Sequence, residues 1–160
     1  MADYYILLGS NQGDRIDMLN KAIEQIQKNI GPVKALSSVY ETEPWGVENQ
    51  ENFLNQALIT TSGKSAPEVW EMVKNIQNDL GKTQEIKWGP RNIDIDILYC
   101  DDLILNSTEL TIPHPRLYER NFVLVPLIEI AGDFTDPKHH LSIDEIFDRC
   151  KDSKEVYLYE

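Results

Sequence analysis

Two aspartates placed two positions apart carry the most specific chemical signal in the sequence. Asp94 and Asp96 alternate with isoleucines, and a Trp-Gly-Pro-Arg turn that ends at Arg91 comes shortly before them. In a strand, residues two apart point to the same side and lie roughly 6.6–6.8 Å apart along the backbone. Their carboxylates can therefore converge on one divalent cation or bridge two. Mg²⁺ takes such oxygen ligands together with substrate phosphates.

An exposed sheet face would explain the same alternation, because strands with one solvated face alternate polar and apolar residues. Aspartate is disfavoured inside strands, however, and the preceding turn supplies a cation and an aromatic side chain at the same end. These features favour a metal site for phosphate chemistry. The sequence contains no Walker-type loop and no protein-kinase motif, so ATP would have to be held on another scaffold.

The aspartate strand lies within an alternation of strands and helices that hydrophobic periodicity predicts. Strands are expected at 4–8, 33–40, 53–61 and 92–99. Helices are expected at 14–30 and 65–80, where apolar residues recur every three or four positions. The second helix begins with a capping box at Ser65. The order β-α-β-β-α-β predicts an α+β fold with a ferredoxin-like core.

The rest of the sequence adds a C-terminal hairpin and helices to that core. Segments 103–105 and 110–112 can pair across a turn, and 116–131 is expected to form one or two helices around Pro126. A second capping box, at Ser142, begins a short helix. We expect α/β/α layers in a single domain over residues 1–160, since no repeat or shift of composition marks a boundary.

Composition restricts the partners and the compartment. The net charge of −12, from 15 basic and 27 acidic residues, disfavours nucleic acid and anionic membrane surfaces. No apolar run reaches the roughly 18 residues of a membrane span, and the first residues lack the segments of a secretory signal. The two cysteines have no metal or redox spacing. We expect a cytoplasmic protein that is a monomer.

Residues 88–97 resemble the signature of the 6-hydroxymethyl-7,8-dihydropterin pyrophosphokinase family, which is Trp-Gly-Pro-Arg followed by aspartates alternating with aliphatic residues. Further segments are similar to that family in the same order: Gly9–Asn11, Tyr40–Gly46, Phe53–Asn55, Ile112–Arg116 and Arg120–Phe122. The resemblance implies transfer of pyrophosphate from ATP to the hydroxymethyl group of the pterin, with release of AMP, in tetrahydrofolate synthesis. It also implies two Mg²⁺ ions held by Asp94 and Asp96.

The resemblance also implies roles for single residues. Catalytic positions correspond to Lys82, Arg91, Asp94 and Asp96. Pterin-binding positions correspond to Gly9, Thr42, Trp45, Phe53, Asn55, Trp88 and Phe122. Here aromatic rings would stack on the pterin and an amide would bind its edge. ATP-binding positions correspond to Lys82, Arg91, Ile97, Thr111, His114 and Arg120. For His114, a turn role with the imidazole bonded to a backbone carbonyl is the alternative.

The sequence departs from the family pattern at several positions. Gln77 stands where an acidic residue is frequent, and Glu109 replaces a basic residue of some members. Arginines are frequent at three further positions, occupied here by Lys82, Gln84 and Lys87. Lysine keeps the charge of arginine but not its bidentate geometry. We expect Lys82 and Arg91 to share the phosphate contacts; full turnover in a Lys82→Ala variant would contradict this.

Three other classes of protein share part of these features. An RNA-binding module has the same order of elements but requires a basic surface. A ligand-sensing domain could use the fold without chemistry, yet it has no need of a metal-binding pair. A generic metal-dependent phosphohydrolase would use the two aspartates but not the aromatic and amide residues at 53, 55 and 122.

Overall fold

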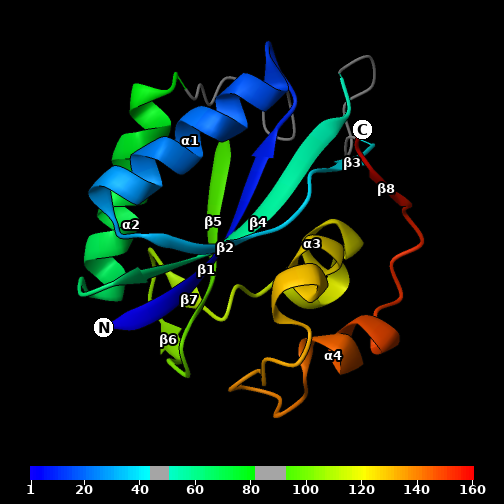
Figure 1. Cartoon of the computed structure of the whole chain (residues 1–160). Coiled ribbons are helices and arrows are strands. Elements are labelled where there is room, and N and C mark those ends of the chain that lie inside the picture. Colours follow the sequence, from blue (N-terminus) through cyan, green and yellow to red (C-terminus); the bar gives the residue numbers. More distant parts are fainter. Residues whose placement is uncertain (44–50, 82–92) are drawn as a thin grey trace.

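The computed structural model describes residues 1–43, 51–81 and 93–160, which form an antiparallel sheet with helices on both faces (Figure 1). In chain order the elements are β1 (Ala2–Ser10), α1 (Arg15–Asn29), β2 (Val33–Leu36), β3 (Tyr40–Thr42), β4 (Phe53–Ser62), α2 (Ala66–Asp79), β5 (Asp94–Cys100), β6 (Leu105–Asn106), β7 (Thr111–Ile112), the 3-10 helix η1 (Leu117–Glu119), α3 (Asn121–Ala131), α4 (Ile143–Arg149) and β8 (Val156–Leu158).

The main sheet has the strand order β5-β1-β4-β3-β8, and β2 also pairs with β4. The four strands predicted for the core therefore lie in the order β5, β1, β4 and then β2 and β3, which both pair with β4. This is the ferredoxin-like arrangement. The strand expected at 33–40 is broken into β2 and β3. From Leu36, opposite Leu58, to Tyr40, opposite Asn55, one side advances four residues and the other three. This bulge is the reason for the break.

Two apolar cores lie on opposite faces of the sheet. Along β1, Tyr4, Ile6 and Leu8 are buried among residues of α1 and α2, whereas Tyr5 and Leu7 are buried among residues of α3 and α4. This separation follows from the two-residue period of a strand. Figure 1 shows α1 and α2 on one side of the sheet and α3 and α4 on the other. The predicted α/β/α layering is confirmed.

Side-chain caps fix the start of three helices where the sequence predicts them. The Asp14 side chain accepts a hydrogen bond from the backbone amide of Asp17 at the start of α1. Ser65 and Ser142 each form a complete capping box, before α2 and α4 respectively. Such caps satisfy amides that have no partner inside the helix. The predicted hairpin is present as β6 paired with β7. Across residues 1–43, 51–81 and 93–160, no helix has both the length and the apolar character needed to cross a bilayer.

The last strand, β8, was not predicted. It pairs antiparallel with β3, so that Val156 lies opposite Thr42 and Leu158 opposite Tyr40. The chain therefore returns after α4 to the far edge of the main sheet (Figure 1).

Candidate functional site

The two aspartates of β5 lie on the face of the sheet that carries α3. Ile93, Ile95 and Ile97 are buried on the opposite face, each at most 2% exposed, in the core shared with α1 and α2. Because successive residues of a strand alternate sides, Asp94 and Asp96 share the α3 face. The Asp96 side chain is 47% exposed. The alternation predicted from the sequence is confirmed, and at least one carboxylate is accessible to a ligand.

Gln77, one of the departures from the family pattern, holds the strand between the two aspartates. Its side-chain Oε1 accepts a hydrogen bond of 2.8 Å from the backbone amide of Ile95. Gln77 is only 6% exposed, on the face of α2 that packs toward β5. A buried backbone amide without an acceptor costs free energy, so Gln77 both satisfies this amide and fixes the middle of the carboxylate pair.

Four residues of adjacent strands stand in one row across the sheet. Asp94 lies opposite Gly9, Gly9 lies opposite Asn55, and Asn55 lies opposite Tyr40. With strands about 4.8 Å apart, Asn55 is about 10 Å from Asp94 at the backbone. Asn55 is in phase with Ala57 and Ile59, which are buried on the α3 face. The carboxylate and the amide therefore face the same side, with a glycine between them.

Gly9 provides a floor without a side chain. A Cβ atom added there would lie 3.2 Å from Asn55 Oδ1 and 3.8 Å from Phe53 Cδ1. Asn55 is itself fixed, because its Nδ2 donates a hydrogen bond of 3.0 Å to Thr42 Oγ1. Asn55 and Thr42 are buried, and Thr42 lies opposite Phe53. The structure thus brings together four of the residues predicted to bind the pterin.

The N-terminus of α3 carries two more predicted residues. The Arg120 guanidinium carbon lies 5.4 Å from the centroid of the Phe122 ring, a cation–π arrangement. Farther along the helix, Glu129 accepts hydrogen bonds from the Tyr40 hydroxyl at 2.6 Å and from the Ser38 amide at 2.9 Å. These bonds hold α3 over the strands that carry Thr42 and Asn55.

His114 faces Asp96 from the loop that follows β7. Its backbone amide donates to Leu98 O at 3.0 Å, which holds the loop against β5. Its Nδ1 accepts a hydrogen bond of 3.2 Å from the backbone amide of Arg116, and its Nε2 lies 3.9 Å from Asp96 Oδ1. In the neutral ring the proton therefore resides on Nε2, toward Asp96. The imidazole does have a turn role, but its backbone partner is an amide and not the carbonyl that we considered.

Burial determines the protonation of this histidine. Desolvation lowers the pKa of His114; the Asp96 carboxylate opposes the shift, and Arg120 and Arg116 add to it. Burial also lowers the pKa of Arg120, and Arg116 adds to that shift. The arginine nonetheless keeps its charge near neutral pH, because the ordinary pKa of a guanidinium lies far above neutrality. The site thus presents a neutral imidazole N–H and a guanidinium near a carboxylate.

A buried carboxylate anchors the segment between His114 and Arg120. Asp136 is fully buried and accepts hydrogen bonds from the Tyr99 hydroxyl of β5 at 2.5 Å and the Tyr118 hydroxyl of η1 at 2.7 Å. Burial raises the pKa of Asp136, but the two hydroxyls and the amides of His139 and Lys138 outweigh it and lower the pKa overall. Asp136 therefore remains ionised and ties η1 to β5.

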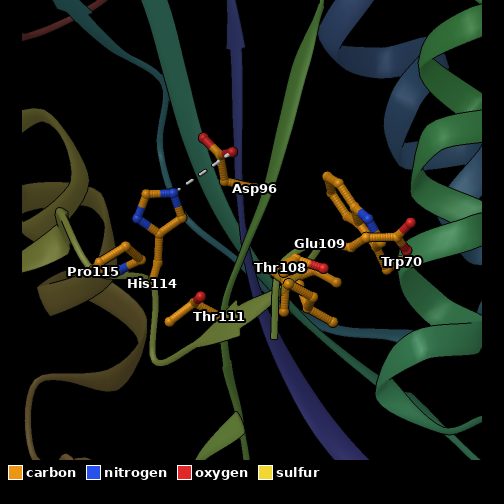
Figure 2. Close-up of a pocket in the computed structure, with 9 residues that line it drawn as sticks. Trp70, Asp96, Thr108, Glu109, Thr111, His114 and Pro115 are labelled. Carbon is orange, nitrogen blue, oxygen red and sulfur yellow. Dashed lines mark ion pairs between the residues drawn. The ribbon is translucent and has the colours of Figure 1, made fainter. Parts of the chain in front are cut away.

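An open pocket of about 210 Å³ lies beside Asp96. Its lining includes Asp96 and the three residues predicted to bind ATP, which are Ile97, Thr111 and His114. The other lining residues had no predicted role: Trp70, Thr108, Glu109, Leu110 and Pro115. Figure 2 shows Asp96 and His114 on one side and Trp70 and Glu109 on the other. The available signal for Trp70 was a large aromatic residue at the edge of the apolar stripe of its helix.

The remaining predicted residues lie outside the described part of the chain. They are Trp45, Lys82, Trp88 and Arg91, and the departures Gln84 and Lys87 lie there too.

The carboxylate pair fits Mg²⁺ by the nature of its donors. In the described segments, no group of three or more His, Cys, Asp and Glu side chains is arranged to hold a metal ion. Mg²⁺ nevertheless needs only one or two protein carboxylates when substrate phosphates complete its coordination shell, and two aspartates on one strand face meet that need. Such a site would depend on the nucleotide for the rest of its coordination.

Comparisons with known proteins identify the family. The model of the family "7,8-dihydro-6-hydroxymethylpterin-pyrophosphokinase (HPPK)" matches residues 5–132. A protein of Aquifex aeolicus, named 2-amino-4-hydroxy-6-hydroxymethyldihydropteridine pyrophosphokinase, is 39% identical over 145 residues, which are 91% of this chain and 90% of the relative. A protein of the same name from Bacillus subtilis is 44% identical over 128 residues, or 79% and 77% of the two chains.

Solved structures agree in fold. A crystal structure of an HPPK-DHPS in complex with substrates has a TM-score of 0.77 at 12% identity, and it covers 92% of this chain. A triple mutant of HPPK-DHPS from Plasmodium falciparum has a TM-score of 0.77 at 14% identity over 92% of this chain. This chain spans only 43% of each of those two chains. These likenesses show the fold alone, whereas the family match and the relatives' identities go further: the chain belongs to the 7,8-dihydro-6-hydroxymethylpterin-pyrophosphokinase family, a family of diphosphotransferases.

Proposed function

We propose that this chain transfers pyrophosphate from ATP to the hydroxymethyl group of 6-hydroxymethyl-7,8-dihydropterin, with release of AMP, in tetrahydrofolate biosynthesis. One observation carries this proposal beyond membership of the family. The row from Asp94 through Gly9 to Asn55 places a carboxylate and a fixed amide on the same face of the sheet, about two strand spacings apart. A phosphohydrolase or a ligand sensor would have no use for both features together.

Asp94 and Asp96 would together hold two Mg²⁺ ions. When bound, Mg²⁺ supplies neutralisation and orientation of the triphosphate. The chain has an excess of 12 negative charges, so cations at the site are required before a polyphosphate can approach it. Arg120 adds a positive charge that interacts electrostatically with Asp96. Lys82 and Arg91 complete the proposed phosphate contacts.

The pocket beside Asp96 suits the nucleoside end of ATP. Ile97 and Trp70 both line this pocket, Trp70 with an apolar ring surface, and Thr111 offers backbone and hydroxyl groups. His114 lies where the pocket meets the carboxylates, with its Nε2 proton available to a phosphate oxygen. A neutral imidazole donates one such bond without adding charge.

The floor at Gly9 suits a flat heterocycle. Asn55 would bind an edge of the pterin with its amide, since an amide presents both a donor and an acceptor. The hydrogen bond from Asn55 Nδ2 to Thr42 Oγ1 turns Nδ2 toward Thr42 and leaves Oδ1 toward Gly9. Phe53 and Phe122 would supply the stacking faces, which aromatic ligands prefer. Trp45 and Trp88, which lie outside the described residues, are further proposed pterin contacts.

The two sites meet at Asp94 and Asp96, so the chemistry reduces to positioning and charge. The hydroxymethyl oxygen of the pterin attacks the β-phosphorus and loses its proton. The bond from the β-phosphorus to the oxygen bridging it to the α-phosphate breaks, and AMP leaves. Holding both substrates in line contributes most of the rate in such transfers. Asn55 orients one substrate, and His114 and Arg120 the other.

Product analysis tests this proposal directly. The purified chain is incubated with ATP, Mg²⁺ and the hydroxymethyl-dihydropterin, and nucleotides are separated by chromatography. AMP in equal amount to the pyrophosphorylated pterin is expected, with none when the hydroxyl is missing from the pterin or Mg²⁺ is chelated. Formation of ADP would show a different transferred group. Nucleotide breakdown without pterin would favour a phosphohydrolase, and no turnover would favour a ligand sensor.

A further inference from the structure

Residues 150–160 contact both sides of the proposed pterin site, although they lie beyond the segment matched by the family model, residues 5–132. Figure 1 shows this segment running from α4 past α3 to β3. One end of it contacts the N-terminus of α3, which carries Arg120 and Phe122, and the other pairs with the strand that carries Thr42.

Asp152 caps α3 from outside the helix. The N-cap residue of α3 is Arg120, and it forms no side-chain capping bond. Instead, Asp152 Oδ2 accepts the backbone amide of Asn121 at 2.9 Å. Asn121 Nδ2 donates in turn to Asp152 O at 2.9 Å and to Lys154 O at 3.4 Å. A carboxylate at a helix N-terminus also interacts favourably with the helix dipole.

Asp152 is itself held in place by the segment that contains it. Its second carboxylate oxygen, Oδ1, accepts the Lys154 amide at 3.0 Å. Two residues farther on, Val156 begins the pairing with Thr42, and the Tyr159 amide then donates to Val39 O at 2.9 Å. The side chain that caps α3 is therefore connected through four residues of backbone to the edge of the sheet at β3.

We propose that Asp152 is a positioning residue, which fixes the first turn of α3 so that Arg120 and Phe122 stay in place relative to Thr42 and Asn55. The functional part of this inference rests on the proposed function. The residue held by Asp152 lies between Arg120 and Phe122 in the sequence. An uncapped first turn frays, and both side chains would then lose their orientation without any change in the carboxylates of β5.

Three variants separate positioning from general stability. Asp152→Ala removes the cap, and Asp152→Asn keeps a side-chain oxygen that can accept the Asn121 amide. Asp148→Ala removes the same charge from an exposed position of α4. Each variant is measured in thermal unfolding, in backbone hydrogen exchange at residues 121–124, and in steady-state kinetics with the pterin and with ATP.

In Asp152→Ala we expect faster exchange at residues 121–124. The KM for each substrate should rise about fivefold, which corresponds to the typical strength of one helix cap, while kcat stays within about twofold. Asp152→Asn should keep exchange rates and KM values close to those of the unsubstituted chain, and Asp148→Ala should match that chain.

Unchanged exchange in Asp152→Ala would overturn the proposal, and so would faster exchange with unchanged KM values. If the KM values rise equally in Asp152→Asn and Asp152→Ala, in proportion to the fall in unfolding temperature, Asp152 only stabilises the fold. That result would also overturn the proposal. If the unsubstituted chain shows no turnover, the proposed function fails, and the exchange data alone then decide whether Asp152 fixes α3.

Discussion

A Gly9→Ala substitution tests the floor between the proposed metal-binding pair and Asn55, the amide proposed to bind the pterin. The backbone at Gly9 is not in the left-handed region, so alanine introduces no conformational strain there. The added methyl group would instead contact Asn55 Oδ1 at 3.2 Å, closer than an ordinary van der Waals contact, and Phe53 Cδ1 at 3.8 Å. The amide must move by a few tenths of an ångström or rotate.

The structure sets the expected size of the effect. Asn55 cannot rotate freely, because its Nδ2 is bonded to Thr42 Oγ1 at 3.0 Å. Losing or misaligning one hydrogen bond to the pterin costs about 0.5–1.5 kcal/mol, which weakens binding by about twofold to twelvefold. The crowding should cost about 1 kcal/mol of stability, the low end for an overpacked site, and lower the unfolding temperature by about 2–4 °C.

Steady-state AMP formation with varied pterin at saturating ATP measures the first effect, and calorimetric titration with the pterin measures the binding constant without turnover. The matched control is Gly63→Ala. Gly63 is exposed in the turn before α2, and a Cβ atom there would have no neighbour within 4 Å. We expect the pterin KM to rise in Gly9→Ala alone, with the ATP KM unchanged in both variants.

A pterin KM in Gly9→Ala within error of Gly63→Ala would refute the assignment of this floor to the pterin. A parallel rise of the ATP and pterin KM values would also contradict it, because the pocket lined by Ile97 and Thr111 does not include Gly9. A fall in unfolding temperature without a kinetic change would make Gly9 a packing requirement of the sheet.

Three further predictions concern other parts of the site. Asp96→Asn should lower kcat/KM by about two to three orders of magnitude and raise the Mg²⁺ concentration needed for half-maximal rate; an unchanged Mg²⁺ dependence would exclude Asp96 as a ligand. The lowered pKa of Asp136 gives stability that is present above the ordinary carboxylate pKa, about 3.9, and is lost as pH falls through the folded-state pKa. Denaturant unfolding of Tyr99→Phe, which removes one of its donors, should therefore show a smaller loss of stability between neutral and acid pH than the unsubstituted chain, and an equal loss would contradict this. Gln77→Leu should cost about 1–3 kcal/mol in denaturant unfolding, because the buried Ile95 amide loses its acceptor; Gln77→Glu keeps an acceptor and should cost less, and equal losses would argue against the hydrogen bond.

Local signals in the sequence accounted for most of the fold. The capping boxes at Ser65 and Ser142 and the apolar spacing of α1 and α2 are contained in a few neighbouring residues, and the structure confirms them. The strict alternation around Asp94 and Asp96 predicted correctly which side chains share a face. Local periodicity suffices in these cases because each element buries one continuous stripe.

Non-local pairing accounts for what the sequence did not reveal. Strand β8 has only three residues, two of which, Tyr157 and Leu158, are more than half exposed, so no buried stripe marks it. Its regularity comes from pairing with β3, more than 100 residues earlier. The cap of α3 likewise comes from Asp152, 31 residues after the amide that it binds. A pattern of neighbouring residues contains no record of such contacts.

The candidate site divides in the same way. A resemblance to a family assigned Gly9, Thr42, Phe53 and Asn55 to one ligand, and the structure brings these four residues together. Trp70 was missed because its role depends on the distance between α2 and β7, which the sequence does not contain. For Gln77, the sequence showed the departure from an acidic residue but not the amide that it binds.

The row from Asp94 to Asn55 also restricts how the chain can misfold. If β5 slipped by one residue against β1, both carboxylates would turn into the apolar layer beneath α1 and α2, and the isoleucines would turn outward. Burying two unpaired charges there would be too costly for such a species to persist. Every refolded molecule should therefore have the correct strand alignment, and the catalytic activity per folded molecule should be the same in independent refolded preparations.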